Sequence, residues 1–146
     1  MSNLLSVEGL SLKDRSTGNE VLKDISFNLR EKEILGVVGE SGSGKTLLSQ
    51  AIVNWLPENL EISSGQINFL GKKMSAMSEN ELEKDIRGRE IAYIGPNAIN
   101  SLDPTYSVGI QLLEKAISID NGNTSKEVLK QKVISLLDDV LIPSPD

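Results

Sequence analysis

The feature that decides the fold is a glycine-rich stretch, Gly39-Glu40-Ser41-Gly42-Ser43-Gly44-Lys45-Thr46. It fits the phosphate-binding pattern G-x-x-x-x-G-K-[S/T] at every fixed position. The apolar run Ile34-Leu35-Gly36-Val37-Val38 precedes it, as expected for a parallel strand buried on both faces. Apolar residues then recur with the spacing of one helix face, up to Pro57: Leu47, Leu48, Ala51, Ile52 and Trp55. Strand, glycine-rich loop and helix in this order are the arrangement that a phosphate-binding loop requires.

The chemistry of this stretch suits concentrated negative charge. Gly39, Gly42 and Gly44 let the backbone wrap tightly, so that successive N–H groups point inward as an anion nest. The following helix adds N–H groups of its first turn and the positive end of its dipole. We expect Lys45 to reach the β- and γ-phosphates of ATP and the Thr46 hydroxyl to ligate Mg²⁺. A glycine-rich turn with a surface lysine is the alternative, and the two flanking elements favour nucleotide binding.

Composition excludes several other classes of function. The chain has 146 residues, a net charge of −6 and no lysine- or arginine-rich run, so nucleic acid is not an expected partner. It contains neither cysteine nor histidine, which rules out thiolate metal sites and histidine acid–base catalysis within the chain. No apolar stretch approaches the roughly 20 residues of a membrane span. The first residues do not have the pattern of a signal peptide, so none is expected. Work at a membrane would therefore need another subunit.

Alternating apolar residues predict antiparallel strands over residues 4–30, with one face on a core. A break at Gly9 indicates a bulge, and the cluster at residues 16–19 indicates a turn. Strands of this kind distinguish the chain from proteins that begin directly with the phosphate-binding strand.

The middle of the chain predicts short elements. We expect a turn at residues 63–65, a strand at 66–70 and a core strand at 91–94. Ser78 and Glu81 are spaced as a capping box for a short charged helix that ends near Arg87-Gly88.

The C-terminal part predicts two helices. The first carries Val108, Ile110, Leu112, Leu113 and Ile117, and a polar turn at residues 120–123 follows it. Thr124 and Glu127 form a second capping-box pattern. It leads a helix whose apolar residues lie on one side and which Pro143 and Pro145 end: Val128, Leu129, Val133, Leu136, Leu137, Val140 and Leu141.

Four later motifs follow the phosphate loop: Ser64-Gly65-Gln66-Ile67, Ile86-Arg87-Gly88, Ile91-Ala92-Tyr93-Ile94 and Ser101-Leu102-Asp103-Pro104. In this order and spacing the chain resembles the N-terminal part of an ABC transporter ATP-binding subunit, most nearly the oligopeptide, dipeptide and nickel importer group. The resemblance implies an α/β fold with an incomplete sheet, as part of one ATPase domain over residues 1–146. It implies an antiparallel β part at 1–32, a P-loop NTPase core at 33–100 and the start of a helical subdomain at 101–146.

Two positions depart from the family's pattern. Asp14 stands where the family has an aromatic residue that stacks on adenine. Pro96 stands at the place of the glutamine that contacts Mg²⁺ and couples to the membrane subunit, and proline offers no side-chain ligand. Asn97 serves instead only if the loop is shifted by one residue, so both positions remain open.

The sequence ends before the family's signature motif, its acidic strand with the catalytic glutamate and its switch histidine. No catalytic residue is therefore assigned in this chain, and we expect that alone it binds ATP without turning it over. Because residues 34–38 are apolar on both faces, we also expect them to lie exposed unless further elements cover them. Such exposure predicts self-association or a loosely ordered C-terminal segment.

The resemblance implies a subunit that hydrolyses ATP to power the import of a small solute such as a peptide. Its implied partners are transmembrane permease subunits and a second ATP-binding subunit, in a homo- or heterodimer at the cytoplasmic face of the membrane. The residues at positions 14 and 96 favour an alternative, a truncated non-catalytic nucleotide-binding or docking module. A third possibility is a different phosphate-loop enzyme such as a small kinase. The antiparallel strands and the motif at residues 101–104 argue against it.

Overall fold

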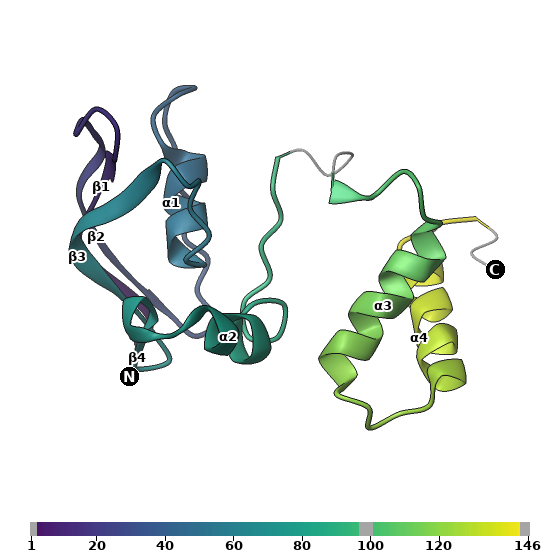
Figure 1. Cartoon of the computed structure of the whole chain (residues 1–146). Helices are drawn as coiled ribbons and strands as arrows, with labels where there is room; N and C mark the ends of the chain where they lie inside the picture. The colour runs from purple at the N-terminus through teal and green to yellow at the C-terminus, as the bar shows by residue number, and fades with distance from the viewer. Residues whose placement is uncertain (1–2, 97–100, 144–146) are drawn as a thin grey trace. The chain divides into compact units, whose positions relative to one another are not determined.

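The computed structural model describes residues 3–96 and 101–143. The chain divides into two compact units, Met1–Tyr93 and Ile94–Asp146, whose elements are labelled in Figure 1. The first unit combines an open sheet with helices, which confirms the predicted α/β class. The subdomain boundaries expected from the sequence, after residues 32 and 100, stay predictions.

The sheet of the first unit has four antiparallel strands in the order β2-β1-β3-β4. Their bounds are β1 (Asn3–Asp14), β2 (Glu20–Arg30), β3 (Leu60–Phe69) and β4 (Lys72–Lys73). Strands β1 and β2 confirm the antiparallel pair predicted over residues 4–30. The turn predicted between them is also present.

Two glycines meet where β1 and β3 both bulge. Gly9 has φ +58° and lies at a register shift of β1, which confirms the predicted bulge. Gly65 has φ +84°, and a Cβ added to it would lie 2.4 Å from the carbonyl carbon of Gly9. The turn predicted at residues 63–65 is wrong, because Ser64 pairs with Ser11 inside β3. The left-handed glycine therefore marks a close approach of two strands instead of a chain reversal.

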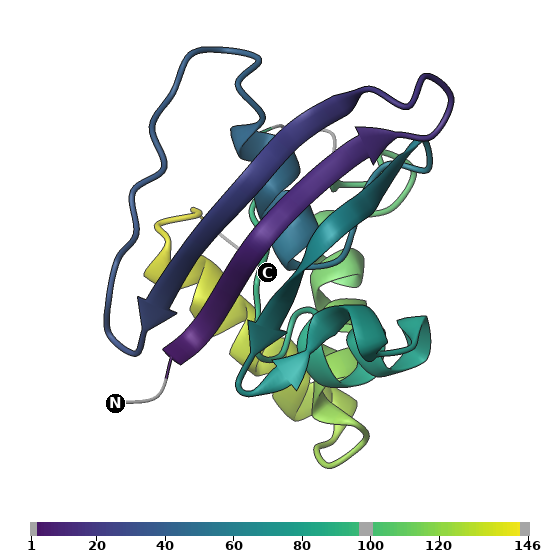
Figure 2. The ribbon, with the colours of Figure 1, turned by 90° about the vertical axis from the view of Figure 1, so that its left-hand side faces the viewer.

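Helix α1 (Lys45–Ile52) packs on the sheet and closes the core, as Figures 1 and 2 show. Leu48 and Ala51 of α1 are buried with the apolar residues of the sheet's inner face, among them Val7, Leu10, Leu12, Ile67 and Phe69. The helix is shorter than its apolar spacing predicts. It ends at Ile52, and Trp55, placed on its face by the sequence, lies beyond it and is 60% exposed.

Short helical turns complete this core. They are η1 (Met74–Ala76), α2 (Glu79–Glu81) and the π-helical η2 (Leu82–Ile86). The predicted capping box is confirmed, because Ser78 and Glu81 each accept from the other's backbone N–H. Leu82 and Ile86 are buried in the same cluster as α1.

Two predicted strands do not form among the described residues. Residues 34–38 are extended but unpaired, with Ile34 95% and Val38 97% exposed. Figure 2 shows this segment, between β2 and α1, running apart from the sheet. Residues 91–94 likewise form no strand: Ile91 makes one isolated bridge to Arg87, and Ile94 is 89% exposed. The expected exposure of residues 34–38 is confirmed, and the self-association expected from it stays a prediction.

The second unit contains a helical pair, α3 (Val108–Asp120) and α4 (Lys126–Asp139). Both predicted helices are present, although α4 ends before Val140 and Leu141, which lie exposed. The predicted cap at Thr124 is wrong. Ser125 caps α4, while the Thr124 hydroxyl donates to Asp120. Within the two described ranges, no helix is long and apolar enough to cross a membrane.

Candidate functional site

The N-terminus of α1 is built to receive an anion. Its cap residue is Gly44, with φ +90°, which supplies no side-chain acceptor for the first-turn N–H groups. No acidic residue lies in the first turn of this helix. The N–H groups of that turn have no partner within the helix, and the helix dipole is positive there. An anion held at this end therefore meets donors and a favourable field.

Gly44 also fixes the loop to the sheet. A Cβ added to it would lie 2.4 Å from Cδ2 of Leu22, a buried residue of β2. Leu48 N–H donates to the Gly44 carbonyl at 2.8 Å, so the first helical turn starts directly from this contact. The close approach to β2 thus determines where the open end of α1 lies.

Lys45 folds back over the loop that precedes it. Its Nζ donates to the carbonyl oxygens of Gly39 at 2.8 Å and Glu40 at 2.6 Å, and to Oγ of Ser43 at 3.3 Å. The backbone of the same loop turns where Ser43 N–H donates to the Glu40 carbonyl at 3.2 Å. The ammonium group is therefore held among loop oxygens, close to where the sequence places phosphate.

Two further glycines of the loop are required for different reasons. A Cβ on Gly39 would lie 2.7 Å from Oγ of Ser43, within the ring of groups around the ammonium. Gly42 has φ +83° and open space around it. The backbone thus adopts a wrapped form in which glycine is required for space at one position and for conformation at the other.

A cavity of about 350 Å³ opens at this place, lined by Ser41, Gly42, Gly44, Lys45, Thr46 and Leu47. Thr46 is exposed, so its hydroxyl is accessible in the first turn. None of these lining residues carries a carboxylate. Within the described chain, no group of three or more acidic side chains gathers to hold a metal ion either. Mg²⁺ would accordingly need phosphate oxygens and water beside the Thr46 hydroxyl.

The structure gives Asp14 a structural role. Its carboxylate accepts from the N–H groups of Ser16 and Thr17, from both hydroxyls, and from Nδ2 of Asn59 at 2.9 Å. These hydrogen bonds, that from the Ser16 hydroxyl above all, hold the pKa of Asp14 well below its ordinary value. The residue ties the β1–β2 turn to the loop before β3, where the resemblance expected an aromatic ring.

The remaining predicted positions lie in the second unit. Pro96 is exposed in a bend, and Asn97 lies outside the described residues. Neither is placed relative to the phosphate loop, so their coupling role stays a prediction. The sequence assigns no role to Arg87, which belongs to one of the four later motifs. Its guanidinium contacts the end of α1, and the motif Ile86-Arg87-Gly88 was the signal that singled it out.

These features, a wrapped glycine loop and a lysine at an open helix end beside an antiparallel sheet, agree with the sequence comparison. The sequence model of the ABC transporter family matches residues 22–142. The chain therefore belongs to the ABC transporter family, as its motifs predicted.

Two similar proteins of this family are ATP-binding proteins of peptide transport systems. The chain is 37% identical to the oligopeptide transport ATP-binding protein OppD of Bacillus subtilis, over 100% of this chain and 41% of that protein. It is 35% identical to the dipeptide transport ATP-binding protein DppD of Escherichia coli, over 97% of this chain and 43% of that protein. The chain thus spans less than half the length of these two relatives.

A solved structure shows the same fold. It is described as a dimeric structure of a post-hydrolysis state of the ATP-binding cassette MJ0796 bound to ADP and Pi. The match has a TM-score of 0.79 and 20% identity, and it covers 96% of this chain and 58% of that one.

Proposed function

We propose that this chain binds the triphosphate of ATP, with Mg²⁺, on residues 39–46. It does so as part of a subunit whose ATP hydrolysis powers import of a small solute such as a peptide. The observation that carries the proposal is the ammonium group of Lys45, held 2.8 Å and 2.6 Å from two loop carbonyls at the open end of α1. Phosphate oxygens offer this ammonium stronger, charged acceptors than the carbonyls do.

Each part of the site has a distinct task in this proposal. The wrapped backbone and the first turn of α1 donate N–H groups to the phosphates. The Lys45 ammonium, which donates to loop carbonyls in this structure, would donate to β- and γ-phosphate oxygens instead. Thr46 is the residue whose hydroxyl would hold Mg²⁺, and the ion would neutralise part of the phosphate charge. Binding is thus an exchange of acceptors around a lysine that is already in place.

The relatives support the wider role. Their names describe ATP-binding proteins of oligopeptide and dipeptide transport. We infer for this chain transmembrane permease subunits as partners and a peripheral position at the cytoplasmic face of the membrane. A second ATP-binding subunit, in a homo- or heterodimer, is inferred as well. The similar solved structure is described as dimeric, which supports this last inference.

One observation favours a second candidate, a nucleotide-binding or docking module without turnover. The residues that line the cavity include no carboxylate that would position water. Phosphoryl transfer to water is accelerated by a residue that orients the attacking water beside the metal ion, and a carboxylate is one group that does so. We therefore propose that the 146-residue chain alone binds ATP but does not hydrolyse it.

Calorimetric titration of the chain with ATP and Mg²⁺ tests the first proposal. Lys45→Ala is expected to weaken ATP binding by at least about tenfold, because a charge-assisted hydrogen bond is lost at each phosphate. Lys72→Ala removes the same charge from exposed β4 and serves as the control. Equal ATP affinity for wild type and Lys45→Ala would reject the assignment.

Measurement of phosphate release tests the proposed inactivity of the chain alone. Steady ATP turnover by the chain, lost on Lys45→Ala, would overturn the inactive module. Binding without turnover agrees with it.

A further inference from the structure

One side chain from another element, that of Arg87, contacts the end of α1 opposite the phosphate loop. Nε of Arg87 donates to the carbonyl of Val53 at 2.9 Å, and Nη2 donates to the carbonyl of Asn54. These carbonyls directly follow α1, at the negative end of the helix. The backbone closes the helix itself, because the N–H groups of Asn54 and Trp55 donate to the carbonyls of Ala51 and Gln50 at 3.0 and 2.9 Å. The Arg87 guanidinium adds one rigid fork that binds the two carbonyls beyond this closing turn.

The guanidinium is itself fixed from the other side. Nη1 of Arg87 contacts Oε1 of Glu79, and Nη2 lies 3.4 Å from Oε2. The Arg87 side chain is only 20% exposed. Its backbone N–H donates to the carbonyl of Leu82 at 2.8 Å, and Leu82 is fully buried. The position of the charge is therefore set by η2 and the core beneath it.

Helix α1 is short enough for its end to matter at its start. It has eight residues, from Lys45 to Ile52, which span about 12 Å at 1.5 Å per residue. A tilt of about 10° about the Arg87 end would move the Lys45 end by about 2 Å over that length. A shift of that size breaks hydrogen bonds of 2.6 and 2.8 Å such as those of Lys45.

We propose that Arg87 is a positioning residue for the phosphate loop: it fixes the far end of α1 and thereby the direction in which the loop and Lys45 face. This inference rests on the proposed binding of ATP at residues 39–46. Glu79 supports it by holding the guanidinium. The residue touches no phosphate and acts through α1.

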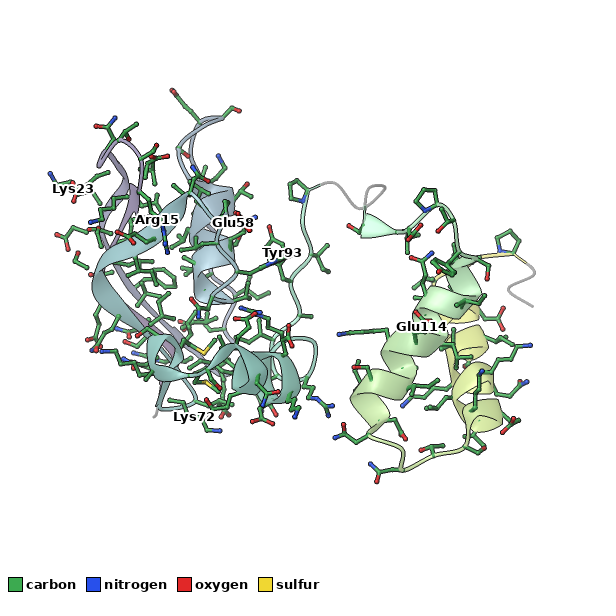
Figure 3. All side chains as sticks on the ribbon, in the orientation of Figure 1. Arg15, Lys23, Glu58, Lys72, Tyr93 and Glu114 are labelled. Atoms are coloured by element: carbon green, nitrogen blue, oxygen red, sulfur yellow. The ribbon has the colours of Figure 1, made fainter. Side chains whose placement is uncertain are left out.

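The chain carries its own reporter beside this clamp. Trp55, the one tryptophan, follows Asn54 directly. Its ring meets that of Tyr93 edge to face, with centroids 5.9 Å apart. Figure 3 labels Tyr93 in the extended segment beyond η2. A movement of the α1 end therefore changes the surroundings of the indole.

The test compares Arg87→Lys with wild type at a temperature at which circular dichroism shows both to be folded. Lysine keeps the charge but lacks the fork that reaches two carbonyls and Glu79 together. We expect ATP affinity to fall about three- to tenfold and the ATP-dependent change in Trp55 fluorescence to shrink. Glu79→Gln should give a smaller change in the same direction. Arg30→Lys, at the exposed end of β2, is the control and should behave as wild type.

The outcomes are distinct. A lower melting temperature with unchanged ATP affinity would make Arg87 a structural contact only and overturn the positioning role, while the proposed function stands. No ATP binding by wild type would overturn the proposed function, and the positioning role with it. A loss of affinity in Arg87→Lys, absent in Arg30→Lys, supports both.

Discussion

Replacing Gly44 with alanine should lower both the stability of the fold and the affinity of the phosphate loop for ATP. Gly44 has φ +90°, in the left-handed region, where a residue with a Cβ costs about 1–2 kcal/mol. The new Cβ would lie 2.4 Å from Cδ2 of Leu22, and overpacking of this kind costs roughly 1–3 kcal/mol. The Leu22 methyl is the end of a flexible side chain, so part of that contact relaxes. We expect the free energy of unfolding to fall by about 2–4 kcal/mol.

Two other glycines separate the contributions. Gly42 has φ +83° and nothing within 4 Å of a built Cβ, so Gly42→Ala should show the conformational cost alone, about 1–2 kcal/mol. Gly36 also has open space, and its φ lies outside the left-handed region. Gly36→Ala should therefore leave stability unchanged or slightly raised. Adding Leu22→Ala to Gly44→Ala removes the clashing atoms, so the pair should cost less than the sum of the single changes.

Urea unfolding followed by far-ultraviolet circular dichroism measures each free energy, and calorimetry gives the ATP affinity of each folded variant. Gly44→Ala should bind ATP more weakly than Gly36→Ala, because the contact that sets the open end of α1 has moved. The reasoning fails if Gly44→Ala is no less stable than Gly42→Ala. It also fails if the changes at Gly44 and Leu22 are simply additive.

Three further predictions concern other parts of the chain. Gly65→Ala should disrupt the pairing of β1 with β3, since its Cβ would lie 2.4 Å from backbone atoms of Gly9 that cannot move aside; a melting temperature equal to that of wild type would contradict this. The pKa of Asp14 is held below its ordinary 3.8, so its stabilising effect is present above that pH and lost as the pH falls further. Asp14→Asn should therefore remove this part of the acid sensitivity of urea midpoints measured from about pH 4 down to about pH 2, and an unchanged acid sensitivity would contradict the assignment. In a full-length subunit, Pro96→Gln should raise Mg²⁺-dependent ATP turnover because it supplies a side-chain ligand, and no gain would mean that Asn97 serves or that the position was misplaced.

The sequence predicted those elements whose partners lie close by in the chain. Residues 25–30 of β2 alternate strictly and β1 alternates on either side of Gly9, and a short turn joins the two strands, so their pairing needs no distant information. Residues 34–38 and 91–94 have equally strong strand patterns. No strand pairs with either of them among the described residues. Periodicity reports which side chains suit a sheet, and it does not report whether a neighbouring strand is present.

The wrong helix cap and the missed contact of Arg87 have different physical reasons. Thr124 and Ser125 both suit a helix cap, and the Asp120 carboxylate takes the Thr124 hydroxyl, so the cap moves by one residue. The loop glycines were predictable because left-handed or crowded backbone requires glycine. The contact of Arg87 with the end of α1 was not, because it joins residues more than thirty positions apart.

Amide hydrogen exchange should be much faster in the unpaired segment at residues 34–38 than in the sheet. Strand β1 is hydrogen-bonded to β2 on one side and to β3 on the other, so its backbone amides exchange with solvent deuterium only when the sheet opens. Residues 34–38 belong to no ladder and are exposed, so their amides exchange at nearly the rate of a free peptide. If the amides of residues 34–38 exchanged slowly, a strand would have paired with this segment, either from another chain or from further sequence. The phosphate loop follows directly, and hydrogen exchange would thus register assembly next to the site itself.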